Sequence, residues 1–213
     1  MSRLKDPFSG LTHLAATLAA IAGTIALWLL APGDLPKQIT LLIYGLSLVA
    51  LYAASSAYHL IVTSPERTAL LRKFDHAAIF ALIAGSFTPP CYTFLTGGWR
   101  WGVLGAVWGI ALAGIIFKFA TIKTHRAINV GLYLVMGWLG TIPAAKMIGV
   151  VPPAAFGWLG LAALFFTVGA IIYGTKKLDL FPGVFGFHEM WHLFVIAGTV
   201  AHFMLVLLYV VPA

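Results

Sequence analysis

The sequence predicts an all-α membrane protein: a bundle of seven transmembrane helices that forms one domain over residues 1–213. Of its 213 residues, 61% are hydrophobic and only 9% are charged. The mean hydropathy is +0.98, well outside the range of a soluble domain. A helix needs about 20 apolar residues to cross a bilayer, so this length allows roughly seven spans with short loops. The function must therefore reside within the bundle or at its two faces.

Seven apolar runs follow one another along the chain, and each is long enough for a transmembrane helix. The first follows the polar segment Met1–Pro7 and is too long for the core of a signal peptide, so we expect it to be retained. Pro, Gly and charged residues separate the runs, most clearly at Pro32-Gly33-Asp34, Ser64-Pro65-Glu66-Arg67, Gly97-Gly98-Trp99-Arg100, Pro152-Pro153 and Phe181-Pro182-Gly183. The expected spans are Leu11–Ala31, Ile39–Val62, Phe74–Leu95, Trp101–Phe119, Ile128–Ala145, Ala154–Tyr173 and Val184–Val211.

Basic residues are unequally divided between the two sides of the predicted bundle. Ten lie on one side, namely Arg3, Lys5, Arg67, Arg72, Lys73, Lys118, Lys123, Arg126, Lys176 and Lys177. The other side has only Lys37, Arg100 and Lys146. Because short cytoplasmic loops are enriched in Lys and Arg, we expect a cytoplasmic N-terminus and an external C-terminus. This placement also explains the net charge of +7, so nucleic-acid binding is not expected.

The stretch His188-Glu189-Met190-Trp191-His192 opens the last span and matches the His-Glu-x-x-His pattern of zinc-binding helices. Positions i and i+4 share a helix face, so both imidazoles can reach one ion. In a soluble metalloprotease the glutamate is the general base and a third ligand comes from elsewhere. Thiolate ligation by a cysteine cluster is excluded, because Cys91 is the only cysteine.

Other polar groups lie at the same depth in two further spans. Ser55 and His59 are four residues apart near the cytoplasmic end of the second span. Asp75 stands at the start of the third. Ionisable groups inside a membrane are costly and usually functional, so we expect these segments to meet at one site. We interpret His13, His76, His125 and His202 as interfacial or packing histidines, because none belongs to a second ligand pattern.

These motifs together resemble the hemolysin III family of bacterial membrane proteins, within the progestin and adipoQ receptor superfamily that includes the adiponectin receptors. The resemblance extends over essentially the whole chain. The residues that carry it are Ser55-x-x-x-His59, Lys73-Phe74-Asp75-His76, Ile83-Ala84-Gly85-Ser86-Phe87-Thr88-Pro89 and the stretch from His188 to His192.

The resemblance implies a zinc ion near the cytoplasmic side, bound by His59, His188 and His192. It places Ser55 and Asp75 beside the metal and its water. Alkaline ceramidases share this arrangement, which implies hydrolysis of a lipid amide. Adiponectin receptors differ at the position of Glu189, so the superfamily does not support a role for Glu189 as the base. They also have a long N-terminal region that is missing here, so hormone reception is not implied.

Three imidazoles and one open position are typical of a catalytic zinc site, where the metal lowers the pKa of its water to about 7. Asp75 is then the predicted general base or water-orienting group. Ser55 would contribute a hydrogen bond or stabilise an oxyanion. The predicted substrate is a membrane lipid with an amide or ester bond, and the predicted location is the bacterial inner membrane.

Several alternatives stay open at the level of sequence. The histidines can be a polar cluster that joins helices. The zinc can be structural in a non-enzymatic, receptor-like regulator, and histidine ligands also suit copper, nickel and iron. The family name suggests a cytolytic protein, which we consider less compatible with a chain retained in its own membrane. Glu189 can face the lipid headgroups or pair with Lys176 or Lys177, and protein partners are not predicted.

Overall fold

The computed structural model describes residues 4–121, 125–181 and 185–213. These residues form helices and contain no β-strand, only two isolated bridges. The elements are α1 (Pro7–Leu30), α2 (Leu35–Leu60), α3 (Pro65–Phe94), α4 (Gly97–Ala120), α5 (Arg126–Trp138), α6 (Thr141–Met147), α7 (Pro153–Thr175), α8 (Phe187–Leu205) and a π-helical turn, η1 (Val206–Val210). With α5 joined to α6 and α8 joined to η1, the described residues give seven segments that can cross a membrane, which confirms the predicted fold class.

Proline and small polar side chains mark where helices begin. Pro7, Pro65 and Pro153 each stand in the first turn of a helix, where a missing N–H costs nothing. The hydroxyl of Ser64 accepts a hydrogen bond from the amide of Arg67 and so caps α3. Ser64, Pro65 and Pro153 are among the residues that the sequence analysis took as breakers between spans.

Helices α1, α2 and α4 each begin four residues before the predicted spans, and two other elements differ more from the prediction. Helix α3 begins at Pro65 and not at Phe74, because its first turns are helical but carry charged side chains that an apolar criterion passes over. The fifth span is divided near Gly140 into α5 and α6. Pro143 has no N–H to donate to the carbonyl of Leu139, so one continuous helix would lose a hydrogen bond there. The predicted features at Arg3, Lys123 and Pro182-Gly183 lie outside the described residues.

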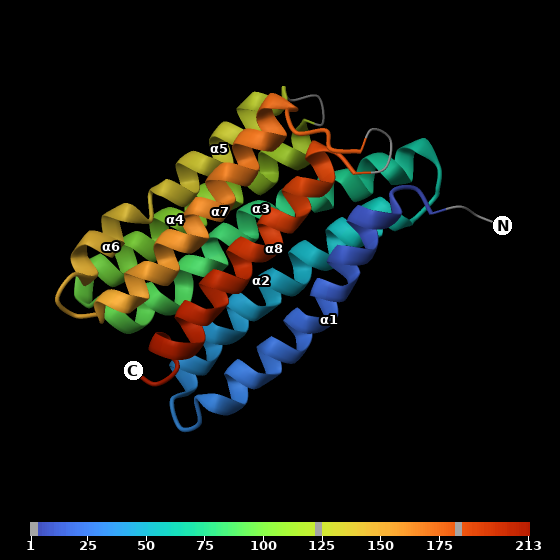
Figure 1. The fold of residues 1–213 in the computed structure, drawn as a ribbon. Helices are drawn as coiled ribbons and strands as arrows, with labels where there is room; N and C mark the ends of the chain where they lie inside the picture. Colours follow the sequence, from blue (N-terminus) through green and yellow to red (C-terminus); the bar gives the residue numbers. More distant parts are fainter. Residues whose placement is uncertain (1–3, 122–124, 182–184) are drawn as a thin grey trace.

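The helices pack as a bundle with the two termini at opposite ends (Figure 1). Helix α2 lies between α1 and α3, while α8 packs on α7 and also meets α1. The main buried core joins α1, α2 and α8 around Leu27, Leu41, Tyr44 and Val206. Apolar side chains on the outer faces of α1, α4 and α5 remain exposed and suit contact with lipid. Helices α1 and α8 begin, and α2 ends, at the same end of the bundle. We call this the histidine end.

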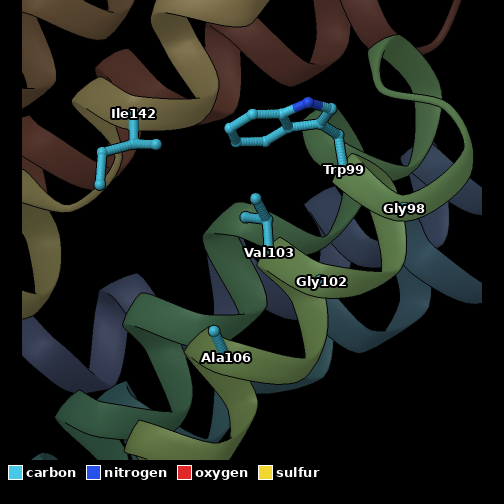
Figure 2. Close-up of a pocket in the computed structure, with 6 residues that line it drawn as sticks. All are labelled: Gly98, Trp99, Gly102, Val103, Ala106 and Ile142. Atoms are coloured by element: carbon cyan, nitrogen blue, oxygen red, sulfur yellow. The ribbon is translucent and has the colours of Figure 1, made fainter.

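A shallow apolar pocket lies at the opposite end of the bundle, between the start of α4 and α6 (Figure 2). Gly98, Gly102 and Ala106 form one wall, and Trp99, Val103 and Ile142 complete it. It contains no metal-ligating side chain and is not part of the histidine site.

Candidate metal centre

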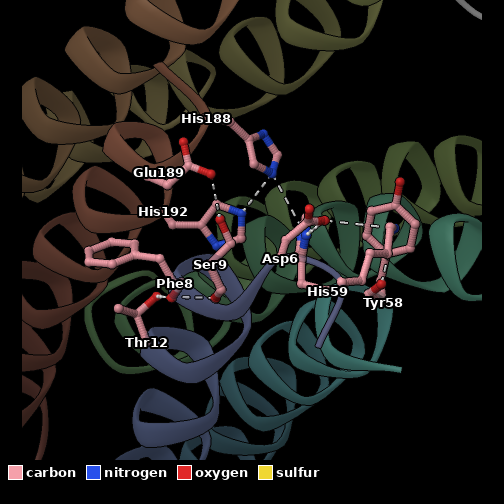
Figure 3. A network of polar contacts seen from close by, with 10 residues as sticks. Asp6, Phe8, Ser9, Thr12, Tyr58, His59, His188, Glu189 and His192 are labelled. Carbon is pink, nitrogen blue, oxygen red and sulfur yellow. Dashed lines mark hydrogen bonds and ion pairs between the residues drawn. The ribbon is translucent and has the colours of Figure 1, made fainter. Parts of the chain in front are cut away.

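Two helices bring three imidazoles together at the histidine end (Figure 3). His59 lies in the last turn of α2, and His188 and His192 lie in the first turns of α8. The Nε2 atom of His188 is 3.3 Å from Nε2 of His59 and 3.2 Å from Nε2 of His192. His59 and His192 are each only 2% exposed, so this is an interior site.

These three nitrogens fit a metal ion. Tetrahedral zinc with Zn–N bonds of about 2.0–2.1 Å requires ligand nitrogens roughly 3.3 Å apart, close to the two measured separations. Hydrogen bonds among the rings alone cannot satisfy the group, because Nε2 of His188 has either one proton or one lone pair but faces two nitrogens. The ligand atoms of the three histidines lie within 4.8 Å of one another, so the cluster could hold one ion.

Asp6 is a site residue that the sequence analysis missed. Its Oδ2 atom lies 3.0 Å from Nδ1 of His59, and its backbone N–H donates to the carbonyl of His59. A carboxylate behind a ligating histidine fixes the ring orientation and holds the proton on Nδ1, which leaves the Nε2 lone pair free. The sequence feature that could have revealed it is a polar stripe that begins at Asp6, just before α1, and continues on that helix through Ser9, His13 and Thr17 at spacings of three and four.

The Glu189 carboxylate accepts hydrogen bonds at the start of its own helix and from α1. Its Oε2 atom accepts a hydrogen bond from the amide of Gly186 at 2.9 Å, and Ser9 donates to its Oε1 atom at 3.3 Å. Glu189 therefore stabilises the first turn of α8 and joins it to α1. It does not belong to the group of possible ligands, and no ion pair with Lys176 or Lys177 occurs among the described residues.

His13 is buried next to the cluster but does not belong to it. Its ring lies 4.0 Å from the ring of His192, centre to centre, and edge-on to Tyr52 at 5.0 Å. Neither of its ring nitrogens has a hydrogen-bond partner among the described residues. This packing position agrees with the role expected for it, and His202 is likewise buried, within 3.2 Å of the Tyr44 hydroxyl.

The two predicted catalytic residues lie beside the cluster. Ser55 is buried one turn before His59 on α2, and Asp75 lies half-buried on α3, close to the Ser55 hydroxyl. Neither belongs to the ligand group of the three histidines. Asp75 and Ser55 therefore remain predicted catalytic residues that lie outside the ligand group.

Comparisons with known proteins agree with this architecture. A family model described as "Haemolysin-III related" matches residues 1–203. The chain is 34% identical to the "Hemolysin-3 homolog" of Bacillus subtilis (strain 168) over 205 residues, covering 95% of this chain and 93% of that protein. It is 31% identical to "Hemolysin-3" of Bacillus cereus over 206 residues, covering 96% and 91%.

A plant protein is also similar. The chain is 30% identical to "Heptahelical transmembrane protein 1" of Arabidopsis thaliana over 199 residues, covering 84% of this chain and 58% of that protein. The resemblance inferred from the motifs is thereby confirmed.

Proposed function

The chain belongs to the haemolysin-III related family of membrane proteins, and on that premise we propose that it is a zinc-dependent hydrolase of lipid amide or ester bonds. The observation that supports this most is the convergence of three imidazole nitrogens in a buried site at one end of the membrane-spanning bundle. A structural zinc site usually has four protein ligands, whereas three histidines leave one position for water or substrate.

His59, His188 and His192 would hold the ion. A bound zinc ion supplies a Lewis acid and a coordinated water of lowered pKa. Asp6 keeps the proton of His59 on Nδ1. The His59 ring is thus oriented by the chain before any substrate binds.

Asp75 and Ser55 would act on the substrate. Asp75 is half-buried beside the cluster, so its carboxylate can accept the proton of an attacking water. Ser55 can donate a hydrogen bond to Asp75 or to the oxygen that gains negative charge. Because the bundle is surrounded by lipid, an acyl chain can approach sideways and present its polar end to the cluster.

The bacterial relatives support a location in the bacterial inner membrane, and the distribution of basic residues supports a cytoplasmic histidine end. In this orientation the N-terminus is internal and the C-terminus external. The hydrolase would then act on lipids of the cytoplasmic leaflet.

The test of this function compares purified wild type with Asp75→Asn in lipid nanodiscs. Both are loaded with zinc and offered a panel of N-acyl and O-acyl lipids, and released fatty acid is measured. We expect turnover by the wild type and a loss of at least about a hundredfold in the variant, with its zinc retained. The proposal fails if the zinc-loaded wild type hydrolyses no lipid in the panel.

A second candidate is a non-enzymatic regulator whose metal is structural. It is favoured by the fact that the possible ligands join α2 to α8, two helices far apart in sequence. In that case Asp75→Asn leaves the physiological function intact, whereas His192→Ala unfolds the histidine end.

A further inference from the structure

Arg126 is held inward at the histidine end by aromatic side chains. It is the first residue of α5, and its guanidinium lies over the rings of Tyr173 at 4.6 Å and Phe187 at 5.0 Å. Its Nη1 atom donates to the carbonyl of Tyr173 at 3.2 Å. Three elements, α5, α7 and α8, therefore fix one half-buried cation.

This cation is separated from the metal centre by a single aromatic ring. The ring of Tyr173 lies 5.7 Å from the ring of His188, measured centre to centre. Arg126, Tyr173 and His188 thus form a continuous row from the rim of the bundle to a predicted metal ligand. To reach Arg126, the polar group of a lipid whose carbonyl is held at the histidines would have to extend past the ring of Tyr173.

No carboxylate compensates Arg126 within the part of the chain that the structure describes. The ion pairs found there join Lys5 to Asp6, Lys37 to Asp34 and His59 to Asp6. A guanidinium has five N–H donors, and the contact with Tyr173 uses one nitrogen. Partly buried charges are normally paired, so the remaining donors of Arg126 favour an anion.

A second buried cation contacts the first turn of α5. Lys118 of α4 is only 3% exposed, and its ammonium donates to the neutral amide of Asn129, three residues beyond Arg126 on α5. The N-terminal end of α5 adds a partial positive charge at Arg126. The positive-inside rule alone does not require this inward placement, because Arg67, Lys176 and Lys177 satisfy it at the same end with exposed side chains.

We propose that Arg126 is the headgroup-recognition residue of the site, and that the lipid substrate carries a carboxylate or phosphate close to its scissile carbonyl. The proposal rests on the proposed hydrolase function. An N-acyl amino acid or an N-acyl phosphoethanolamine has this chemistry, whereas a neutral ceramide-type lipid does not.

The test measures binding, not turnover. Purified protein in nanodiscs of zwitterionic phosphatidylcholine is titrated with radiolabelled N-oleoylglycine, O-phospho-N-oleoylethanolamine and neutral N-oleoylethanolamine, all with the same acyl chain. Each titration is performed with zinc and after removal of metal by a chelator. The carboxylate and phosphate probes distinguish between the two kinds of anionic headgroup.

We expect wild type to bind at least one anionic probe roughly ten- to a hundredfold more tightly than the neutral probe, the range for hydrogen bonds to a charged group. Arg126→Gln should remove this preference, with or without metal. The matched control Arg67→Gln removes an exposed cation at the same end and should keep it. A monodisperse Arg126→Lys protein should retain part of the preference if the charge is what matters.

Equal affinity of the wild type for charged and neutral probes would overturn the proposal. A preference that survives Arg126→Gln, or that disappears when the metal is removed, would also overturn it, because the anion would then bind elsewhere. The outcome is independent of the hydrolase assay. A charge preference without turnover would support the anion site at Arg126 and contradict the hydrolase function. Turnover without a charge preference would support the hydrolase function and contradict the anion site.

Discussion

At the scale of single residues, the predicted histidines and the missed aspartate illustrate what a sequence can and cannot reveal. His188 and His192 were predictable because their spacing of four on a helix is a local property. Asp6 was not, because it lies before the first apolar run and 53 residues from His59, and only the packing of α1 against α2 brings them together. The role of Glu189 likewise depends on Gly186 and Ser9, which no His-Glu-x-x-His pattern includes.

The contact between Asp6 and His59 should strengthen metal binding. Asp6→Asn keeps the shape of the side chain but removes the charge behind His59, so metal affinity should fall by roughly ten- to a hundredfold. Zinc affinity is measured by competition with a chromophoric chelator. Asp34→Asn is the control, because Asp34 also precedes a transmembrane helix but lies next to Lys37 at the other end of the bundle. An Asp6→Asn protein with wild-type affinity would show that the contact does not tune the metal site.

At the scale of helices, composition predicted the spans better than their ends. The polar first turns of α3 and the division of α5 from α6 were missed. Hydropathy shows which residues suit an apolar environment, but it does not show where the backbone hydrogen bonds of a helix begin and end. The close approach of α7 to α8 also depends on tertiary contacts. A Cβ atom on Gly169 would lie 2.6 Å from Cβ of Phe194, so this pair of helices requires glycine there.

Gly169→Ala should therefore push α7 away from α8 and lower stability by about 1–3 kcal/mol, the usual cost of overpacking. Thermal unfolding in detergent measures this loss. Gly160→Ala on the same helix is the matched control, since a Cβ atom there would have no neighbour within 4 Å. Its stability should be unchanged or slightly higher, because alanine favours helix over glycine. Equal unfolding temperatures for the two variants would contradict this account of the α7–α8 contact.

At the scale of the whole molecule, the bundle places its chemistry at one end and its lipid contacts on the outer helices. The largest buried cluster lies mainly among α1, α2 and α8; α2 and α8 supply the histidines, and Asp6 directly precedes α1. The fold class was predictable because seven long apolar runs allow few other architectures. The convergence of the second and last spans was not derivable from hydropathy; it was predicted from the polar groups that lie at one depth, and the resemblance to a family then assigned the three ligands.

A bound metal should stabilise the entire bundle, because its ligands link α2 to α8. At a free metal concentration 1,000 times the dissociation constant, the gain is about 4 kcal/mol. Removing metal with a chelator should thus lower the unfolding temperature of the wild type, and adding zinc should restore it. A His188→Ala/His192→Ala variant should unfold at one temperature regardless of chelator, and a chelator effect of equal size in that variant would argue against linkage through these ligands.

The metal content of the purified protein tests the central claim most directly. Wild type and His188→Ala/His192→Ala are purified in detergent without added metal, checked for a single folded species, and subjected to elemental analysis. We predict about one zinc ion per wild-type chain and none in the variant. A folded wild type without metal, or a variant that keeps its zinc, would contradict a metal centre at His59, His188 and His192.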